Sequence, residues 1–378
     1  GTSRIAYRIS RIAYRRPLVT FHVSRFADSS FIIHHSAFPL ALLIPAHDEA
    51  AIIADTVAAA RADCGPDDAV IVIADNCADD TAAAAERAGA LVLARADAQN
   101  AGKGAALRWA VAQPMLAGFA GIVVLDADSR IHPGFCDALR AALLGGADAA
   151  QGFVQPVGVH ASPASALAGY SELLSQIFDE QARSDLGWPL RLRGTGMAFR
   201  ADLFVALAPR LQTFVEDSEL SLLLARDRRK TAFVAGAVLD DPKPQDAALV
   251  ARQRARWLQG ERDLRRLYRA DLLALLRRGP AGWSLLQAVI VKPKTLFLAL
   301  KLAVLLLLAA GRWPFAAGYW LLAALLPELL YYALGLLFVP DRPLYARALL
   351  RAPLYLLMWA RSLLLARARR GWLSVRTR

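Results

Sequence analysis

Carboxylates stand where two buried segments of this sequence end. The apolar run 69–74 is followed at once by Asp75, and the run 121–125 by Asp126 and Asp128. Like charges held together repel one another unless a cation or hydrogen-bond donors face them. In an extended chain Asp126 and Asp128 point to the same side, and a hard divalent cation, Mg²⁺ or Mn²⁺, suits such a pair. A turn acid followed by a helix cap is the alternative.

A third group of acids, Glu216, Asp217 and Glu219, opens an apolar helical segment. One of these acids could serve as a general base that takes a proton from a hydroxyl acceptor. Acids in the first turn of a helix are also favoured by the helix dipole. The spacing alone leaves both interpretations open.

The segment 253–260, QRARWLQG, is the most specific signal in the chain. On a helix it places Gln253, Arg256, Trp257 and Gly260 on one stripe, at i, i+3, i+4 and i+7. An arginine can bind a diphosphate through two nitrogens, a tryptophan offers a flat surface to a sugar ring, and a glycine permits close approach. Such a stripe is unusual for a core face and indicates a binding surface.

Residues 38–150 must position the first two acid groups. Short Val/Ile/Leu runs alternate there with alanine-rich helical stretches, which predicts a parallel sheet covered by helices on both faces. Ligands bind at the carboxyl ends of strands in such sheets, so Asp75 and the pair Asp126/Asp128 are expected along one edge. No dinucleotide-binding GxGxxG and no GxxxxGK[ST] is present. Lys103, in the turn NAGKG, could meet a phosphate or be simply solvated.

Composition narrows the class of protein. Of the 378 residues 56% are hydrophobic, the formal net charge is +12, and the apolar excess gathers after about residue 281. Arginine clusters beside apolar stretches favour a membrane surface over nucleic acid as the partner. Cys64, Cys77 and Cys136 show no paired spacing, which suits a reducing compartment and argues against disulfides or a zinc site.

The chain divides into three predicted parts. Residues 1–36 are expected to be a poorly ordered basic extension, or a segment foreign to the protein, because "SRIAYRI" and "SRIAYRR" nearly repeat and no apolar stretch is long enough for a signal peptide or a span. Residues 37–275 would form the catalytic domain, and residues 276–378 a membrane region.

Within that last part, residues 295–311 and 313–339 are predicted to cross a bilayer, with Lys301 and Glu328 facing protein instead of lipid. Residues 344–367 are predicted to form an amphipathic helix in the interface, because their arginines gather on one side. A buried helical hairpin is the alternative for the two spans.

Taken in order, the motifs PAHDE, DNCADDT, NAGK, DAD, GTGMAFR, ED and QRARW resemble those of the family 2 inverting glycosyltransferases. The resemblance covers about residues 38–270 and is closest to the membrane-embedded, cellulose-synthase-like or polysaccharide-synthase branch with its QxxRW motif. It implies an α/β fold of the GT-A type, a nucleotide-diphospho-sugar transferase domain with a mostly parallel central sheet. C-terminal transmembrane and interfacial helices would follow that domain.

The resemblance also implies roles for individual residues. Asp217 would be the catalytic base, and Asp126 and Asp128 would hold the Mg²⁺ or Mn²⁺ that neutralises the leaving diphosphate. The acceptor would be bound by Trp257 and by the loop Gly194, Thr195 and Gly196. The donor would be bound by Ala46, Glu49, Asp75, Lys103, Asp126, Gln253 and Arg256.

Three features depart from the family pattern. His47-Asp48 stands where an aromatic residue or His followed by Asn is usual, Cys77 replaces the commoner Gly, and the spanning helices that precede the catalytic domain in many relatives are absent. The last departure bears on whether the enzyme could make a long polymer, because a processive synthase needs a translocation channel.

The expected function is therefore transfer of a sugar, with inversion, from a nucleotide-diphosphate donor to a glycan or lipid-linked acceptor in exopolysaccharide or cell-envelope biosynthesis. A UDP-sugar is the expected donor, and the expected location is a bacterial inner membrane, with the catalytic domain in the cytoplasm. Membrane lipid and export proteins are expected partners, and nucleic acid is not. The alternatives are a lipid glycosyltransferase that resembles ceramide glucosyltransferases, a non-catalytic membrane partner subunit, and a sugar nucleotidyltransferase.

Overall fold

The computed structural model describes residues 38–243, 247–290, 301 and 315–351. The predicted basic extension, residues 1–36, lies outside the described residues. So does the predicted span 295–311 apart from Lys301.

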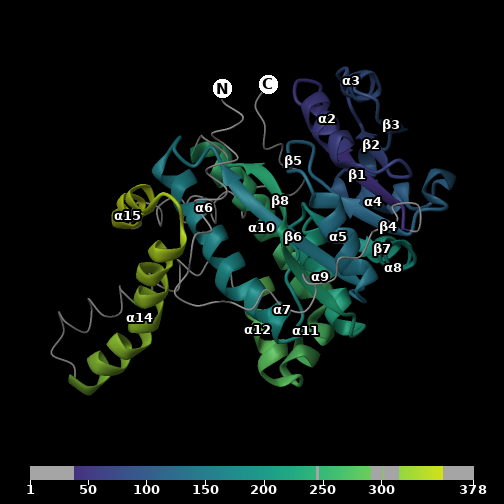
Figure 1. Ribbon diagram of the computed structural model, residues 1–378. Coiled ribbons are helices and arrows are strands. Elements are labelled where there is room, and N and C mark those ends of the chain that lie inside the picture. Colours follow the sequence, from purple (N-terminus) through teal and green to yellow (C-terminus); the bar gives the residue numbers. More distant parts are fainter. Residues whose placement is uncertain (1–37, 244–246, 291–300, 302–314, 352–378) are drawn as a thin grey trace.

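The described residues form one eight-stranded sheet with the order β3-β2-β1-β4-β7-β6-β8-β5 (Figure 1). The first four strands in this order pair in parallel, whereas β7 is antiparallel to both β4 and β6, and β5 is antiparallel to β8. The predicted parallel sheet is thus confirmed for residues 38–124, within a sheet that is mixed as a whole. The strands are β1 Leu40–Ala46, β2 Ala69–Asp75, β3 Leu91–Arg95, β4 Gly121–Val124, β5 Arg130–Ile131, β6 Ala149–Val157, β7 Met197–Arg200 and β8 Thr231–Pro242.

Helices cover both faces of the sheet because alternate strand residues point to opposite sides. Leu42 and Val72 belong to one buried cluster with α2, α3 and α5, and Leu43 and Ile71 to another with α4, α8 and α9. The helices are α2 Ile53–Asp63, α3 Thr81–Arg87, α4 Lys103–Ala110, α5 Phe135–Leu144, α6 Pro163–Leu174, α7 Gln181–Asp185, α8 Ala201–Leu207, α9 Glu216–Arg226, α10 Ala247–Leu267, α11 Arg269–Leu276, α12 Gly279–Ile290, α14 Phe315–Gly335 and α15 Arg342–Leu350. Short helical turns are η2 Ala98–Asn100, η3 Pro114–Leu116, η4 Ser175–Glu180, η5 Ala208–Arg210 and η6 Leu336–Phe338.

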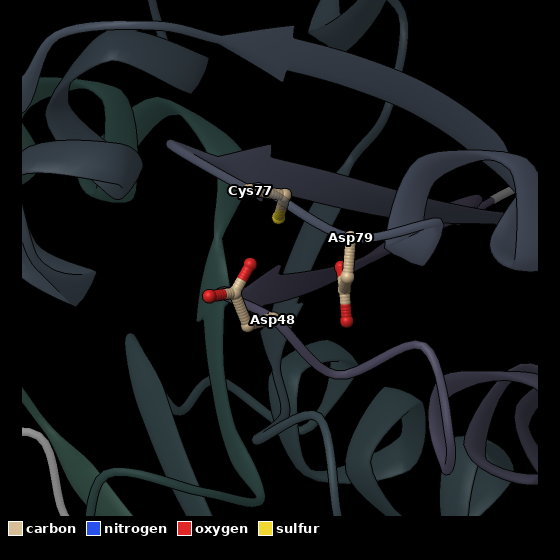
Figure 2. A group of neighbouring side chains, drawn as sticks. All are labelled: Asp48, Cys77 and Asp79. Carbon is tan, nitrogen blue, oxygen red and sulfur yellow. The ribbon is translucent and has the colours of Figure 1, made fainter. Parts of the chain in front are cut away.

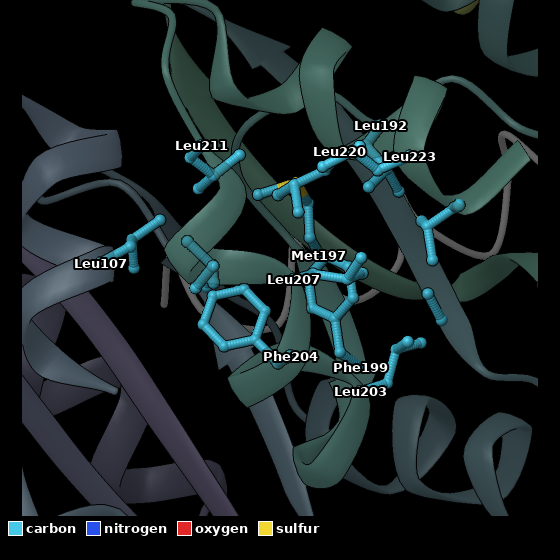
Figure 3. Close-up of a cluster of buried hydrophobic side chains, with 14 of the residues drawn as sticks. Leu107, Leu192, Met197, Phe199, Leu203, Phe204, Leu207, Leu211, Leu220 and Leu223 are labelled. Atoms are coloured by element: carbon cyan, nitrogen blue, oxygen red, sulfur yellow. The ribbon is translucent and has the colours of Figure 1, made fainter. Parts of the chain in front are cut away.

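A dense apolar cluster fixes α9 against the sheet (Figure 3). Phe199 of β7 and Phe204 of α8 are fully buried, and their ring centroids lie 4.9 Å apart. Leu220 and Leu223 of α9 and Leu107 of α4 complete this part of the cluster. The first turn of α9, which carries the acids 216–219, is therefore held by core packing.

No helix in the described part of the chain is long and apolar enough to span a membrane. The segment 313–339, predicted as a span, contains α14 and η6, and α14 carries Pro327 and Glu328 in its interior. Glu328 pairs with Lys301 at 2.5 Å. Because no such helix is found among the described residues, the predicted location as a multi-pass protein of a bacterial inner membrane is wrong.

The C-terminal end of α14 packs against α6. The hydroxyl of Tyr170 in α6 donates to the carbonyl of Tyr332, and a Cβ at Gly335 would collide with Leu174. The start of the predicted interfacial helix 344–367 lies in α15, which packs beside α6 (Figure 1), with Tyr345 stacked on Tyr170 at 5.1 Å. The rest of that predicted helix, from residue 352, lies outside the described residues.

Replacing Phe199 by Ala should lower the free energy of unfolding by about 3–5 kcal/mol, because it leaves a cavity in the cluster under α9. Chemical denaturation would measure the loss. Phe214→Ala is the matched control, since Phe214 is 43% exposed and its truncation should cost less than about 1 kcal/mol. Equal losses for the two variants would contradict the assignment of Phe199 to the core.

Candidate active site

The loops after β1 and β2 are fastened to each other at the carboxyl edge of the sheet (Figure 2). Asp48 accepts a hydrogen bond from the Ala78 amide at 2.7 Å, and Asp79 accepts one from the Ala50 amide at 3.1 Å. Cys77 lies between the two acids, and its burial raises the pKa of its thiol. Both carboxylates thus accept hydrogen bonds from backbone amides of the other loop. We therefore interpret Asp48, Cys77 and Asp79 as a structural clasp that holds the two loops together.

Asp75 ends β2 and is almost fully buried. Its carboxylate accepts from the Arg95 guanidinium at 2.5 Å, from the Asn76 side-chain amide at 2.9 Å and from the Gly102 backbone at 3.2 Å. Arg95, the last residue of β3, was not singled out from the sequence. Its partnership with Asp75 explains how a buried carboxylate is tolerated at the strand end.

Two other residues predicted to bind the donor lie on the same wall. Ala46 is the buried last residue of β1. The backbone amide of Glu49 donates to Thr81 Oγ1 at 2.7 Å, which ties the loop after β1 to the start of α3. The structure therefore brings Ala46, Glu49 and Asp75 to one edge, as expected.

Lys103 joins three separate parts of the chain. From the first turn of α4, its ammonium donates to Asp126 at 2.6 Å and to the Gly194 carbonyl at 2.6 Å, and it lies 3.3 Å from Glu216. Burial by itself lowers the pKa of Lys103, but the carboxylates of Asp126 and Glu216 outweigh it and hold that pKa above its usual value. The residue is a charged bridge within the site and not a solvated lysine.

Three aspartates lie close together where β4 and β8 end. Asp126, Asp128 and Asp241 each offer a carboxylate oxygen within 4.8 Å of the others. Burial, followed by the negative charges of Asp126 and Asp241, raises the pKa of Asp128 to about 7. Three carboxylates in one place are the ligand set that Mg²⁺ or Mn²⁺ prefers. We call Asp126, Asp128 and Asp241 the acid trio.

The loop 193–196 passes over Lys103 in a conformation that requires glycine. Gly194 and Gly196 have φ values of +87° and +67°, a region that L residues rarely adopt. Thr195 Oγ1 accepts from the Asp126 amide at 3.1 Å and lies 2.7 Å from Ser129 Oγ. The predicted acceptor loop thus rests directly on the end of β4, which carries Asp126 and Asp128 of the acid trio.

Buried Gln151 in β6 holds the same loop from the other side. Its side-chain amide donates to the Thr195 carbonyl at 2.9 Å, and its side-chain oxygen accepts from the Arg193 amide at 2.9 Å. With both ends of Gln151 occupied, the loop has a single defined position. Gln151 gave no motif signal in the sequence.

The three acids that open α9 have different environments. Glu219 is fully buried and accepts from the amides of Gln212 and Thr213 and from the Tyr268 hydroxyl at 2.6 Å, which makes it a structural anchor. Burial raises the pKa of Glu216, and Lys103 only partly offsets this rise. Asp217 is half-buried. Its environment therefore differs from that of the anchor Glu219 and from that of Glu216, which lies beside Lys103.

The helix α10 brings the QxxRW stripe to the start of α9. A Cβ at Gly260 would lie 2.7 Å from Val215 Cγ1, so the two helices meet there at close range. Gln253 and Arg256 are half-buried, and Trp257 is 38% exposed. That this stripe contacts a diphosphate and an acceptor stays a prediction.

Asp241 and Lys243 belong to the site but were not predicted from the sequence. Asp241 and Lys243 lie at the end of β8, in the segment LDDPK, and the rule that found Asp75 and Asp126 would also have selected an acid at that strand end. β8 pairs in parallel with β6, a pairing that the sequence does not display. A search for acids at the ends of strands, extended to residues 231–243, would have found Asp241.

Comparisons with known proteins identify the family of this chain. Residues 37–260, well over half of the chain, match the model of the family "Glycosyltransferase like family 2". The chain belongs to this family, and the protein is a glycosyltransferase with a GT-A-like α/β domain. No curated protein matches the chain.

Two solved structures illustrate the similarity. A mannosyltransferase from Pyrobaculum calidifontis, in complex with GDP-Man and Mn²⁺, is 17% identical, with a TM-score of 0.54, 92% of this chain covered and 93% of that one. Glucosyl-3-phosphoglycerate synthase from Mycobacterium tuberculosis, with Mn²⁺, UDP and phosphoglyceric acid, is 24% identical, with a TM-score of 0.40 and coverage of 57% and 74%. The acid trio itself meets the expectation of a Mg²⁺ or Mn²⁺ cofactor, because its three carboxylates could hold such an ion.

The raised pKa of Asp128 predicts a pH dependence for the metal-free protein. Between about pH 4 and pH 7 the folded protein binds more protons at this carboxyl than the unfolded chain does, so its contribution to stability falls as the pH rises. Asp128→Asn should remove this cost and stabilise the protein by roughly 1–3 kcal/mol at about pH 8, but not at about pH 4.

Chemical denaturation in a chelator at the two pH values would measure this difference. Asp202→Asn, at an exposed carboxylate, is the control and should show no such trend. An Asp128→Asn variant that is destabilised equally at both pH values would exclude the predicted cost of a buried, charged Asp128 beside Asp126 and Asp241.

Proposed function

We propose that this glycosyltransferase moves a sugar, with inversion, from a nucleoside-diphosphate sugar to a hydroxyl of a glycan or lipid-linked acceptor. A UDP-sugar is the proposed donor, and exopolysaccharide or cell-envelope biosynthesis the proposed setting. The observation that carries the proposal is the Lys103 bridge, because it gathers Asp126, the acceptor loop at Gly194 and the acids that open α9 around one ammonium.

On the donor side, the clasped loops after β1 and β2 would hold the nucleoside. The contacts of Asp75 support a rigid wall there, since Arg95 and Gly102 fix its carboxylate. Gln253 and Arg256 would approach the diphosphate from α10, because a guanidinium suits paired phosphate oxygens. Lys103 would contribute a further positive charge.

The acid trio fits a divalent cation. Its three carboxylate oxygens converge, and burial together with the charges of Asp126 and Asp241 raises the pKa of Asp128. Asp126, Asp128 and Asp241 would hold Mg²⁺ or Mn²⁺, which when bound neutralises charge on the leaving diphosphate. Asp241 is the addition that the structure makes to the predicted pair of ligands.

Asp217 would be the general base. Of the acids that open α9, Glu219 is tied to backbone amides and Tyr268, and Glu216 to Lys103. Asp217 is the remaining carboxylate, one residue from the Lys103 bridge. It would take the proton from the acceptor hydroxyl while the sugar bond to the diphosphate breaks, which gives inversion in a single displacement.

The acceptor would lie between the loop 193–196 and Trp257. The exposed indole offers an apolar surface to a sugar ring, and the two glycines let the acceptor approach the backbone. A glycan acceptor would give a longer saccharide, whereas a lipid acceptor would give a single glycosyl-lipid. Export partners stay a prediction without structural support.

The test is transfer itself. Purified protein with Mn²⁺ or Mg²⁺ is incubated with a panel of labelled UDP- and GDP-sugars and with glycan and lipid acceptors, and the released nucleoside diphosphate and labelled product are measured. The proposal expects one donor to give nucleoside diphosphate and a labelled product with inverted anomeric configuration. Release of pyrophosphate, or a product with retained configuration, would refute it.

Asp217→Asn should reduce the rate of transfer by at least about 10²-fold, because the acceptor hydroxyl loses its base. Binding of the nucleoside diphosphate should change less than about threefold, since the donor contacts remain. Calorimetry and product release would measure the two quantities. Asp202→Asn serves as the control on an exposed acid, and unchanged turnover in Asp217→Asn would remove this residue from the mechanism.

A further inference from the structure

A chain of alternating charges leads away from the acid trio. Lys243, directly after β8, pairs with both Asp241 and Glu172. Glu172, in the last turn of α6, also pairs with Arg193 at 3.2 Å, and Arg193 reaches Glu180 at 3.0 Å. The side chains of Lys243 and Glu172 are only 12% and 16% exposed, so water screens these pairs weakly.

The acid trio is therefore already partly neutralised by two lysines. Lys103 lies on Asp126, and Lys243 lies on Asp241. Each ammonium group is shared with a further carboxylate, Lys103 with Glu216 and Lys243 with Glu172, so the two lysines neutralise the trio only in part. A divalent cation that uses the same oxygens must compete with both ammonium groups.

We propose that Lys243 is the internal counter-ion of the acid trio, and that it lowers the affinity of the trio for a divalent cation by occupying Asp241. Glu172 moderates this effect, because it draws the same ammonium away from Asp241. Lys243 and Glu172 are thus positioning residues that act through Asp241. The inference rests on the proposed role of the trio as the metal site.

Charge balance explains what such an arrangement does. A divalent cation adds its charge to a site that two lysines have already partly neutralised, and the diphosphate of a donor brings further negative charge to that cation. Cation and nucleotide are then expected to bind better together than either does alone. The two lysines would keep the trio from holding a cation tightly in the absence of a donor.

The experiment is calorimetric titration of the full chain with Mn²⁺ alone. Lys243→Met should bind Mn²⁺ about tenfold more tightly than the wild type, because one competing charge is gone. Glu172→Gln should bind it several-fold more weakly, because the ammonium then has Asp241 as its one anionic partner among the pairs described here. Lys243→Arg, which keeps the charge, should stay close to the wild type.

Controls separate charge from folding. Lys230→Met removes an exposed lysine just before β8 and should leave Mn²⁺ affinity unchanged, and circular dichroism checks that each variant is folded. The opposite signs for Lys243→Met and Glu172→Gln are the decisive result, since a purely structural role would weaken binding in both.

Weaker or unchanged Mn²⁺ binding by folded Lys243→Met, in a wild type that binds the ion, would overturn the inference while leaving the metal site in place. Mn²⁺ is therefore titrated a second time in the presence of UDP and of GDP. A wild type that binds no Mn²⁺ alone or with either nucleotide would overturn the metal site of the proposed function and the role of Lys243 together.

Discussion

The ammonium of Lys103 is the contact on which the site depends. It is bonded to Asp126 after β4, to the Gly194 carbonyl before β7, and lies beside Glu216 at the start of α9. These groups are far apart in the sequence and each carries a full or partial negative charge. Without a cation among them they would repel one another, so one lysine lets the acid-bearing segments converge in the protein's own ground state.

The sheet explains why the segments arrive at the same place. β4 ends at the carboxyl edge, and β7 is antiparallel to it, with Met197 opposite Val124, so the loop that precedes β7 lies beside Asp126. β6 is antiparallel to β7 and β8 is parallel to β6, which brings the end of β8, and with it Asp241, to this edge as well. The reversal of a single strand, β7, thus places the loop 193–196 and a third acid, Asp241, next to Asp126 and Asp128.

Much of this could be predicted from local pattern. Continuous apolar runs gave β1 to β4, and the acids that follow them gave Asp75, Asp126 and Asp128. Arg95 and Gln151 could not be found in that way, because their roles depend on strand order and register. Asp241 also lies at a strand end, but only the pairing of β8 with β6 shows that this end lies beside Asp126. The high hydropathy of residues 313–339 led to the wrong prediction of a membrane span. Hydropathy does not show that Glu328 pairs with Lys301 or that α14 packs on α6.

The contact between Gly260 and Val215 sets a limit on how this enzyme could be re-engineered. Backbone and side chain meet there with no room for a methyl group, so a bulkier residue at 260 would act as a wedge between α10 and α9. Position 260 must therefore stay without a side chain if the present spacing of α10 and α9 is to be kept.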